Sequence, residues 1–525
     1  MSSDISRPTE KELSSYRPLR DTFRVDCGFV TVPGLEERIR PFHQKLRHWD
    51  LLASDAEENH DGPRIEHYDP VGNRIDRIWL PEPTRQLRRE VVLAGIFENQ
   101  TQVEQFAKVY LLGHLGEASV TCPLACTEGL VRVIEAVGSD LLRKVYLPKL
   151  RSVETPLAGA QFITEKDMGS DVGALTTRAV PDGEGRWRLF GEKWFCSAVD
   201  EYFLIAARPD GAPEGTAGVG IFFVPRTFEG ALNGLKINRL KEKIGTRQLP
   251  TAEIDLEGAV GFNIGPVNHG FKNLMNYVIN TSRLMNAAAA CGFASRAVLE
   301  ARNYTEQRSA FGSKIIQYPM VREGLERMES ALFARRALFF KLVTEIDSGP
   351  AGFESDEGLW RRFLINLCKY RTAVGATEAT REAILLLGGN GTIETFSILP
   401  RLYRDSLVIE SWEGAHNVLA LQICRDALRF PFGPYLNDRV LRQLSLIRGG
   451  PLTETVELIE QQLERINPLL QKIPDPEWVG SNARRLVDAL GLLLEVTALA
   501  ETPRASPEKI ALIKSWIQNH PCLFF

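Results

Sequence analysis

The stretch Leu402-Tyr-Arg-Asp-Ser-Leu-Val-Ile-Glu-Ser-Trp-Glu-Gly-Ala-His-Asn417 decides how the rest of the chain is interpreted. Within it, Glu413 lies between a tryptophan and a glycine, and apolar residues at helical spacing begin at Val418. A carboxylate at such a turn can be partly removed from water, which raises its pKa and suits it to act as a base. The alternative is that Glu413 is an ordinary acid at the start of a helix, where the helix dipole favours it.

Length and composition describe a globular protein of several units. The 525 residues are too many for one ordinary core, and the formal net charge of −4 gives no sign of a nucleic-acid surface. No apolar run approaches the roughly twenty residues that span a membrane, and the first residues lack a signal-peptide core. The eight cysteines and eight histidines form no ligand-like clusters, which predicts free buried thiols, no metal site and a cytoplasmic protein.

Changes of hydrophobic period divide the chain into five parts. A polar arm with one helix precedes a helical unit, a segment of period two rich in Gly and Pro predicts a β-unit, and helical spacing then returns. The predicted boundaries are an arm at 1–60, a helical domain at 61–158, a β-domain at 159–265, a helical bundle at 266–430 and a helical extension at 431–525.

The fold class is therefore multidomain α+β. Short strand candidates such as 187–191, 193–197, 252–256 and 259–262 predict a sandwich or barrel of about a hundred residues. Four long helices follow and predict a four-helix bundle; they span residues 271–307, 319–346, 357–387 and 415–428. In the extension, an apolar stripe within residues 486–499 is expected to bury against the bundle or another subunit.

Three separated motifs point to one family. They are Phe162-Ile-Thr-Glu-Lys-Asp-Met-Gly-Ser-Asp171, then Gly388-Gly-Asn-Gly391 with Leu399-Pro-Arg-Leu-Tyr-Arg-Asp405, and finally Trp412-Glu-Gly414. In this order, and with helical, β and helical units in succession, residues 60 to 430 resemble the acyl-CoA dehydrogenase flavoprotein superfamily. Lys193-Trp-Phe-Cys-Ser-Ala198 and the two terminal extensions resemble the branch that contains the bacterial protein AidB.

The resemblance implies a catalytic pair and a reaction. In this family a carboxylate removes the α-proton of an acyl-CoA while a hydride leaves Cβ for FAD, and donors to the thioester carbonyl stabilise enolate-like charge. Glu413 stands at the position of the base, and its backbone N–H at that of one carbonyl donor. Arg283 matches an arginine kept near the base, although it could equally be a solvated helix residue.

The resemblance also implies two sets of FAD-binding residues. Thr164 and Ser197 would offer hydroxyls to the flavin ring, Phe195 would pack beside it, and Ser170 would meet the pyrophosphate. The alternative role of Thr164 and Ser170 is to form turns, and that of Phe195 is to pack in the β-core. The residues assigned to the same cofactor around the base are Trp412, Gly414 and Asn417.

A second set would reach the cofactor of a neighbouring subunit. Arg308 and Phe311 match the family's interface stretch, with the guanidinium on the pyrophosphate, and Gly388 and Gly389 would accept the adenine end. The alternative for Arg308 is a cation that interacts with a helix C-terminus, and the alternative for Gly388 and Gly389 is an ordinary glycine C-cap. Three departures from the family pattern fall on loops that would face the cofactor and are expected to weaken its retention: Met168, Leu385 and Ala415.

Four functions compete at this point. The leading one is a tetrameric, FAD-dependent dehydrogenase of long-chain acyl-CoA that passes electrons to an electron-transfer flavoprotein. The AidB resemblance suggests a DNA-binding, protective flavoprotein, but residues 434–525 carry ten Lys and Arg against eleven Asp and Glu, which argues against DNA. An acyl-CoA-sequestering protein would share the site, whereas a nitroalkane-type oxidase tends to use Asp where this chain has Glu413.

Overall fold

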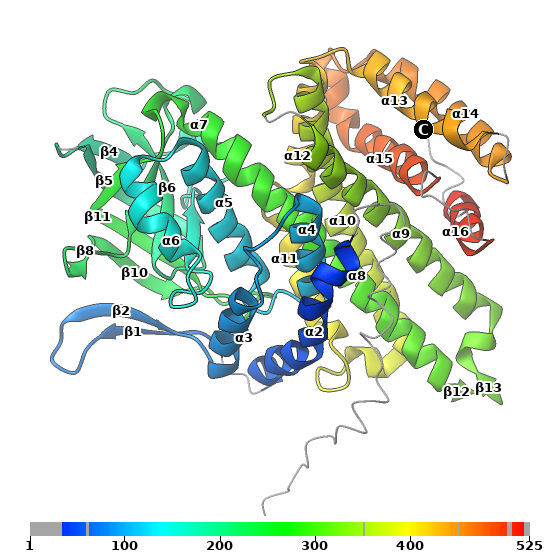
Figure 1. Ribbon diagram of the computed structural model, residues 1–525, viewed down its shortest axis with the longest axis horizontal. Coiled ribbons are helices and arrows are strands. Elements are labelled where there is room, and N and C mark those ends of the chain that lie inside the picture. Colours follow the sequence, from blue (N-terminus) through cyan, green and yellow to red (C-terminus); the bar gives the residue numbers. More distant parts are fainter. Residues whose placement is uncertain are drawn as a thin grey trace, which may run out of the picture.

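The computed structural model describes residues 34–58, 62–183, 185–349, 352–448, 451–500 and 507–518. Figure 1 shows a β-domain on one side, a bundle of long helices in the middle, and the C-terminal helices against the far side of the bundle. None of the described helices is long and apolar enough to cross a lipid bilayer. Among the described cysteines, the thiols of all six are free and buried, as predicted.

The N-terminal part is helical apart from one hairpin. The hairpin consists of β1 (Arg64–Tyr68) and β2 (Arg74–Trp79). Helix α2 (Leu35–Glu58) is the one helix predicted within the arm, and it buries Phe42, Leu46 and Trp49 against its own chain. Residues 1–33 of that arm lie outside the described residues. The helical unit that follows consists of α3 (Glu82–Leu93), α4 (Gln102–Gly113), α5 (Thr121–Val137), a π-helical turn (Leu142–Tyr146) and α6 (Leu147–Leu150).

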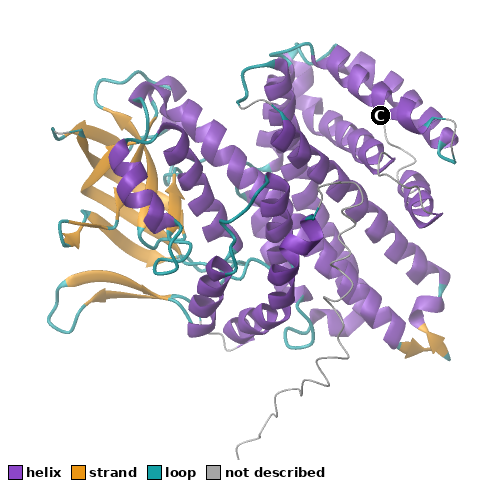
Figure 2. Cartoon of the chain, viewed as in Figure 1, coloured by secondary structure: helices purple, strands orange, loops and turns teal. Residues whose placement is uncertain are grey.

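The β-domain is a barrel, and Figure 2 shows its strands gathered on one side of the molecule. Strands β11, β5, β4, β6 and β7 pair in a closed ring, because β7 bonds to both β6 and β11. β10 and β3 extend this sheet. Its seven strands are β3 (Gly159–Phe162), β4 (Arg178–Pro181), β5 (Arg186–Ser197), β6 (Tyr202–Pro209), β7 (Gly220–Pro225), β10 (Leu235–Leu240) and β11 (Thr251–Asn263). A small hairpin of β8 (Thr227–Phe228) and β9 (Ala231–Leu232) lies beside them.

Two predicted breaks between strands were wrong. Residues 187–191 and 193–197 belong to one strand, β5, and residues 252–256 and 259–262 belong to one strand, β11. In β11 the register shifts at Gly258, whose φ of 79° fits a bulge that only glycine adopts without strain. A glycine within a strand can therefore mark a bulge rather than the end of the strand.

The predicted four-helix bundle is present as α8 (Asn280–Gln307), α9 (Pro319–Ser348), α10 (Asp356–Leu387) and α12 (His416–Ala427). A short helix α7 (Gly270–Asn273) and a π-helical turn (Leu274–Ile279) lead into α8. The hairpin of β12 (Ser309–Ala310) and β13 (Ser313–Lys314) joins α8 to α9. The sequence analysis missed α11 (Leu399–Ser411), which has a proline in its first turn and carries the stretch before Glu413.

The extension consists of α13 (Phe432–Ile447), α14 (Thr453–Leu470), α15 (Pro476–Ala500) and α16 (Pro507–Gln518). Helix α15 packs on α9, α10 and α12, and its predicted apolar stripe is buried there. Val487, Leu490, Leu493 and Leu494 are each less than 5% exposed. The expectation that this stripe buries against the bundle is confirmed, and the extension shares the core of the bundle.

Candidate active site

Glu413 lies in the four-residue connection between α11 and α12. Its φ is 57°, and that of Gly414 is 105°. A left-handed conformation is unfavourable for a residue with a side chain, by about 1–3 kcal/mol, and persists only where the surroundings impose it. The N-cap of α12 is Ala415, which makes no side-chain cap, so the alternative that Glu413 caps the helix is wrong.

Two buried cations hold the backbone of this connection. Arg283 on α8 donates from Nε to the Glu413 carbonyl at 3.0 Å and from Nη1 to Asn366 Oδ1 at 2.6 Å. Lys369 on α10 donates from Nζ to the carbonyls of Glu410 and Gly414, at 3.0 and 3.2 Å. Arg283 is only 4% exposed, so the alternative of a solvated helix residue is also wrong.

Burial has the largest single effect on the pKa of the Glu413 carboxyl. Desolvation raises the pKa of the Glu413 carboxyl, while the charges of Arg283 and Lys369 and a hydrogen bond from Ser282 act in the opposite direction. Burial lowers the pKa of Lys369 to about 7 and that of Arg283 to about 10. A carboxylate with a raised pKa beside fixed cations is the arrangement expected of a general base.

The connection lies where the barrel meets the bundle. Trp412 is half-buried and packs against the core of the barrel and against the core formed by α8, α9, α10 and α11. From the barrel side, Gln161 on β3 donates to Ser282 Oγ at 3.2 Å. Through these contacts, elements more than a hundred residues apart in the chain converge on Glu413.

Three of the predicted flavin contacts lie together at one end of the barrel. Thr164 follows β3, and its carbonyl accepts from the Trp194 backbone N–H at 2.9 Å, next to Phe195 on β5. Phe195 is 55% exposed, so its alternative assignment to the β-core is wrong. Ser197 Oγ lies 2.9 Å from Thr251 Oγ1 on the adjacent strand.

The loop from Thr164 to Ser170 is fixed by a buried carboxylate. Glu165 accepts hydrogen bonds from the backbone and hydroxyls of Thr176 and Thr177 and pairs with Lys193 Nζ at 2.9 Å. Burial alone would raise the pKa of Glu165, but the charge of Lys193 and these hydrogen bonds outweigh it and lower the pKa to about 2. Ser170 is exposed at the end of this loop, whereas the Met168 side chain packs against Leu175 and so does not occupy the surface of the loop.

This carboxylate predicts a pH-dependent difference in stability. Because the pKa of Glu165 is lowered in the folded state from 4.5 to about 2, its contribution is complete above pH 4.5 and is lost as the pH falls toward 2. We expect Glu165→Gln to be less stable than the wild type at pH 7 and the difference to shrink at pH 3.5. Urea denaturation at both pH values measures it, and a difference that stays constant would contradict the assignment.

The predicted interface residues lie apart from Glu413 in the single chain. Phe311, at the tip of the β12–β13 hairpin, is 98% exposed, and Figure 1 places this hairpin at the end of the bundle away from the barrel. Arg308 is the C-cap residue of α8, and Gly388, with a φ of 62°, is the C-cap residue of α10. Both residues therefore occupy the helix-end positions that were given as their alternative roles. Asn390 Nδ2 donates to Tyr304 Oη at 3.2 Å and ties the glycine turn, Gly389 included, to the end of α8.

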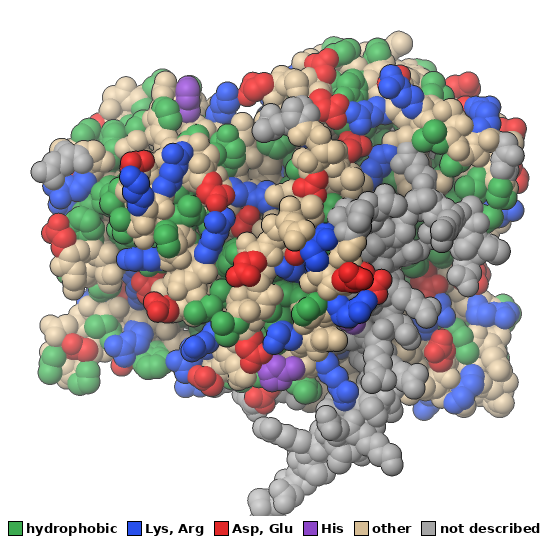
Figure 3. All heavy atoms as spheres, viewed as in Figure 1, with side chains coloured by type: hydrophobic (Ala, Val, Ile, Leu, Met, Phe, Trp, Pro, Cys, Tyr) green, Lys and Arg blue, Asp and Glu red, His purple; other side chains and the backbone are tan. Residues whose placement is uncertain are grey.

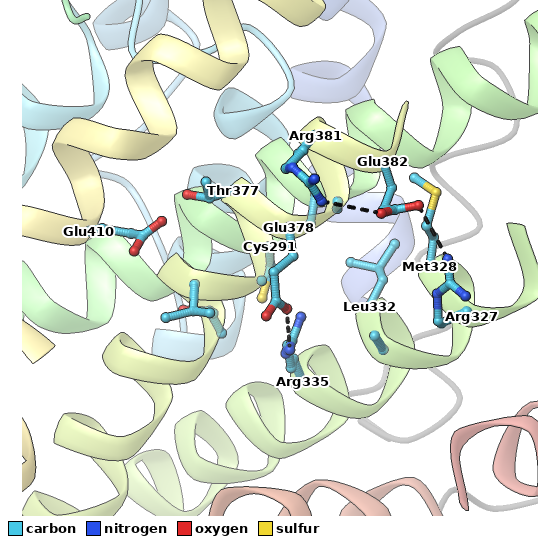
Figure 4. A pocket seen from close by; sticks show the side chains of 16 residues that line it. Cys291, Arg327, Met328, Leu332, Arg335, Thr377, Glu378, Arg381, Glu382 and Glu410 are labelled. Carbon is cyan, nitrogen blue, oxygen red and sulfur yellow. Dashed lines mark hydrogen bonds and ion pairs between the residues drawn. The ribbon is translucent and has the colours of Figure 1, made fainter. Parts of the chain in front are cut away.

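A cavity of about 380 Å³ is lined by residues of α8, α9 and α10 and by Glu410, three residues before Glu413. Figure 4 shows Glu410 and Thr377 at one end of the lining, and the ion pairs of Arg335 with Glu378 and of Arg327 with Glu382 among the other lining side chains. His416 Nε2 lies 3.0 Å from Glu410 Oε2, and this contact between the two sides of Glu413 is an ion pair when the imidazole is protonated. Lys369, Glu410 and His416 were not among the site residues predicted from the sequence. The one local pattern that could have indicated a buried functional group is the lysine within the largely apolar run 363–370. Asn417, at the start of α12, is exposed.

Known proteins resemble both halves of this site. Residues 160–259 match the family model "Acyl-CoA dehydrogenase, middle domain", and residues 268–428 match "Acyl-CoA dehydrogenase, C-terminal domain". Acyl-CoA dehydrogenase family member 11 of Caenorhabditis elegans is 32% identical over 88% of this chain and 79% of its own length. AidB of Escherichia coli is 30% identical over 76% of each chain.

Solved structures show the same fold. The Caenorhabditis elegans ACDH-11 structure in complex with C11-CoA superposes with a TM-score of 0.87 at 28% identity, covering 98% of this chain and 90% of that one. An acyl-CoA dehydrogenase from Bacillus anthracis complexed with FAD gives 0.71 at 19% identity, covering 83% and 81%. The fold predicted from the motifs is thus confirmed, with a helical N-terminus, a central β-domain, a helical bundle and an extension. The chain belongs to the acyl-CoA dehydrogenase family of oxidoreductases.

Proposed function

We propose that this protein is an FAD-dependent dehydrogenase of long-chain acyl-CoA, with Glu413 as the base that removes the α-proton. The observation that carries the proposal is the conformation of Glu413: a half-buried carboxylate in left-handed backbone, held at its carbonyl by Arg283 and at the next by Lys369. A carboxylate that only stabilised a helix would need neither the unfavourable φ nor two buried cations.

The residues at the end of the barrel fit a flavin. Phe195 leaves an apolar ring 55% exposed beside the hydroxyl of Ser197, and Thr164 is joined to the same strand through its carbonyl. An exposed aromatic ring next to hydroxyls suits a flat, partly polar ring system. At Gly169, next to Ser170, a Cβ would meet no atom within 4 Å, so the loop has room for a phosphate to approach.

The chain's own groups would then act on the substrate. FAD, when bound, supplies the two-electron acceptor for the hydride that leaves Cβ. The Glu413 carboxylate takes the α-proton, so the two C–H bonds break, a Cα–Cβ double bond forms and the proton remains on Glu413. The Glu413 backbone N–H would donate to the thioester carbonyl, and the Arg283 and Lys369 contacts keep that donor and the base in fixed relation.

Substrate, acceptor and assembly extend the same proposal. The ACDH-11 structure holds C11-CoA, which supports a medium to long acyl chain for this protein. We assign the electron acceptor to an electron-transfer flavoprotein, the partner that the family resemblance implies. Arg308, Phe311, Gly388 and Gly389 are assigned to the FAD of a neighbouring subunit in a homotetramer, which accounts for the nearly complete exposure of Phe311.

The test is a visible absorption spectrum of the purified protein before and after anaerobic addition of acyl-CoA of 10 to 18 carbons. We expect a flavin band that bleaches with at least one chain length. A flavin band that none of them bleaches, although acyl-CoA binds, would replace the proposal with a sequestering protein. Peroxide release during aerobic turnover would instead indicate an oxidase.

The DNA-binding alternative gains no support from the surface. On the face shown in Figure 3, the acidic and basic side chains of the described residues are interspersed. Of the Arg484–Arg485 pair in the extension, Arg484 donates to Tyr370 Oη at 3.1 Å and is thus engaged within the protein. A basic stripe is what duplex DNA would require.

A further inference from the structure

The C-terminal extension is joined to the bundle by a cluster of charges. Arg371 on α10 forms a bidentate pair with Glu495 on α15, at 2.7 and 3.1 Å, and reaches Asp488 at 3.2 Å. Arg371 and Glu495 are both buried, at 7% and 1% exposed. The matched family model ends at residue 428, so these partners on α15 lie outside it. Breaking such a buried pair by removing one partner is usually costly, which gives α15 a fixed place on α10.

The residue before Arg371 extends this cluster toward the active site. Tyr370 is 2% exposed, and its hydroxyl donates to Asp488 Oδ1 at 2.8 Å and accepts from Arg484 Nε at 3.1 Å. The Arg484 guanidinium also lies over the ring, 5.6 Å from its centre. Two side chains of α15 therefore fix the position of this ring.

The Tyr370 ring also contacts His416, the first residue of α12, directly after the connection that carries Glu413. His416 lies edge-on to it, with ring centres 5.1 Å apart and planes at 69°. His416 pairs with Glu410 at 3.0 Å, and the Glu410 carbonyl accepts from Lys369, the neighbour of Tyr370 on α10. Contacts therefore run without interruption from α15 to residues on both sides of Glu413.

We propose that the extension is part of the catalytic apparatus: α15 positions Tyr370, and Tyr370, His416 and Glu410 hold the connection that presents Glu413. The left-handed φ of Glu413 needs restraints from its surroundings, and Arg283 and Lys369 supply part of them at the carbonyls of Glu410, Glu413 and Gly414. The pairing of His416 with Glu410 closes the connection at its two ends. The inference rests on the proposed function, since it assigns a positioning role for that reaction.

Two conservative variants test it in the full-length protein. Tyr370→Phe removes the hydroxyl bonded to Asp488 and Arg484 but keeps the ring on His416, and Asp488→Asn keeps the shape but removes the charge. The matched control is Asp438→Asn, which removes an exposed ion pair with Arg442 on α13, away from Tyr370. We expect both test variants to reduce flavin about tenfold more slowly with acyl-CoA, with less than about twofold change in acyl-CoA affinity.

Hydrogen exchange of the peptide 408–418 is the second readout, and it does not depend on activity. We expect faster exchange there in Tyr370→Phe and Asp488→Asn, with exchange in the barrel strands unchanged. Wild-type exchange of this peptide in both variants would overturn the inference, whether or not acyl-CoA reduces the flavin. Faster exchange with a wild-type rate of reduction would overturn the catalytic role. Failure of the wild-type protein to be reduced by any acyl-CoA would instead overturn the proposed function.

Discussion

Glu413→Gln is expected to slow the reduction of bound flavin by acyl-CoA by about 10²- to 10⁴-fold, the range that a positioned general base contributes. Glutamine has the same shape but cannot accept the α-proton. The contacts of Arg283 and Lys369 go to backbone carbonyls rather than to the carboxylate, so the connection should keep its conformation in the variant. Stopped-flow absorbance under anaerobic conditions measures the rate, and titration of the flavin band measures acyl-CoA affinity.

The matched control is Glu323→Gln, which changes an exposed glutamate on α9. It should reduce flavin at the wild-type rate. The variant at the base should still bind acyl-CoA with an affinity close to that of the wild type, because only the reacting group has been removed. A rate in Glu413→Gln within tenfold of the wild type would exclude Glu413 as the base.

Much of the architecture follows from local pattern, and the exceptions have physical reasons. The change of period at Gly159 and its return after residue 265 are properties of neighbouring residues, so barrel and bundle could be predicted. A glycine near the middle of β5 and of β11 predicts a break in each, whereas pairing with adjacent strands carries the backbone through it. Helix α11 was not predicted because residues 399–405, with which it begins, entered only as a motif for the family resemblance.

The active site was predictable only where one residue type at one position carries the chemistry. The position of Glu413 between tryptophan and glycine ahead of a helix makes it a candidate base, and the family resemblance is what favours that role over an ordinary acid at the start of a helix. Whether Arg283 is buried could not, because α8 has little hydrophobic asymmetry and is enclosed on most sides. Lys369 and His416 act through contacts with residues up to 46 positions away, which no local pattern encodes. The non-local contacts decide between the alternatives that the sequence leaves open.

Lys369→Met should have the second largest effect, because one side chain supplies both a charge and two hydrogen bonds to the connection. Methionine has a similar length and no donor, so the carbonyls of Glu410 and Gly414 lose their partner. A shift of the base by about 1 Å can cost about 10²-fold, and we expect a fall of that order in the rate of flavin reduction at pH 7. Because the charge of Lys369 lowers the pKa of Glu413, the acid limb of the rate profile should also move to higher pH.

Lys369→Gln separates the two contributions, since an amide restores a donor without the charge. We expect it to recover part of the rate but to keep the displaced acid limb. The pH dependence of stability is an independent test. The pKa of Lys369 in the folded protein is about 7, below the ordinary value of 10.5, so the unfolded state binds more protons than the folded state between these two pH values. Wild-type stability should therefore gain from this group as the pH rises from 7 to 10, and both variants should lack that gain. Melting temperatures that change in parallel for wild type and Lys369→Met over this range would show that Lys369 is not the buried cation described here.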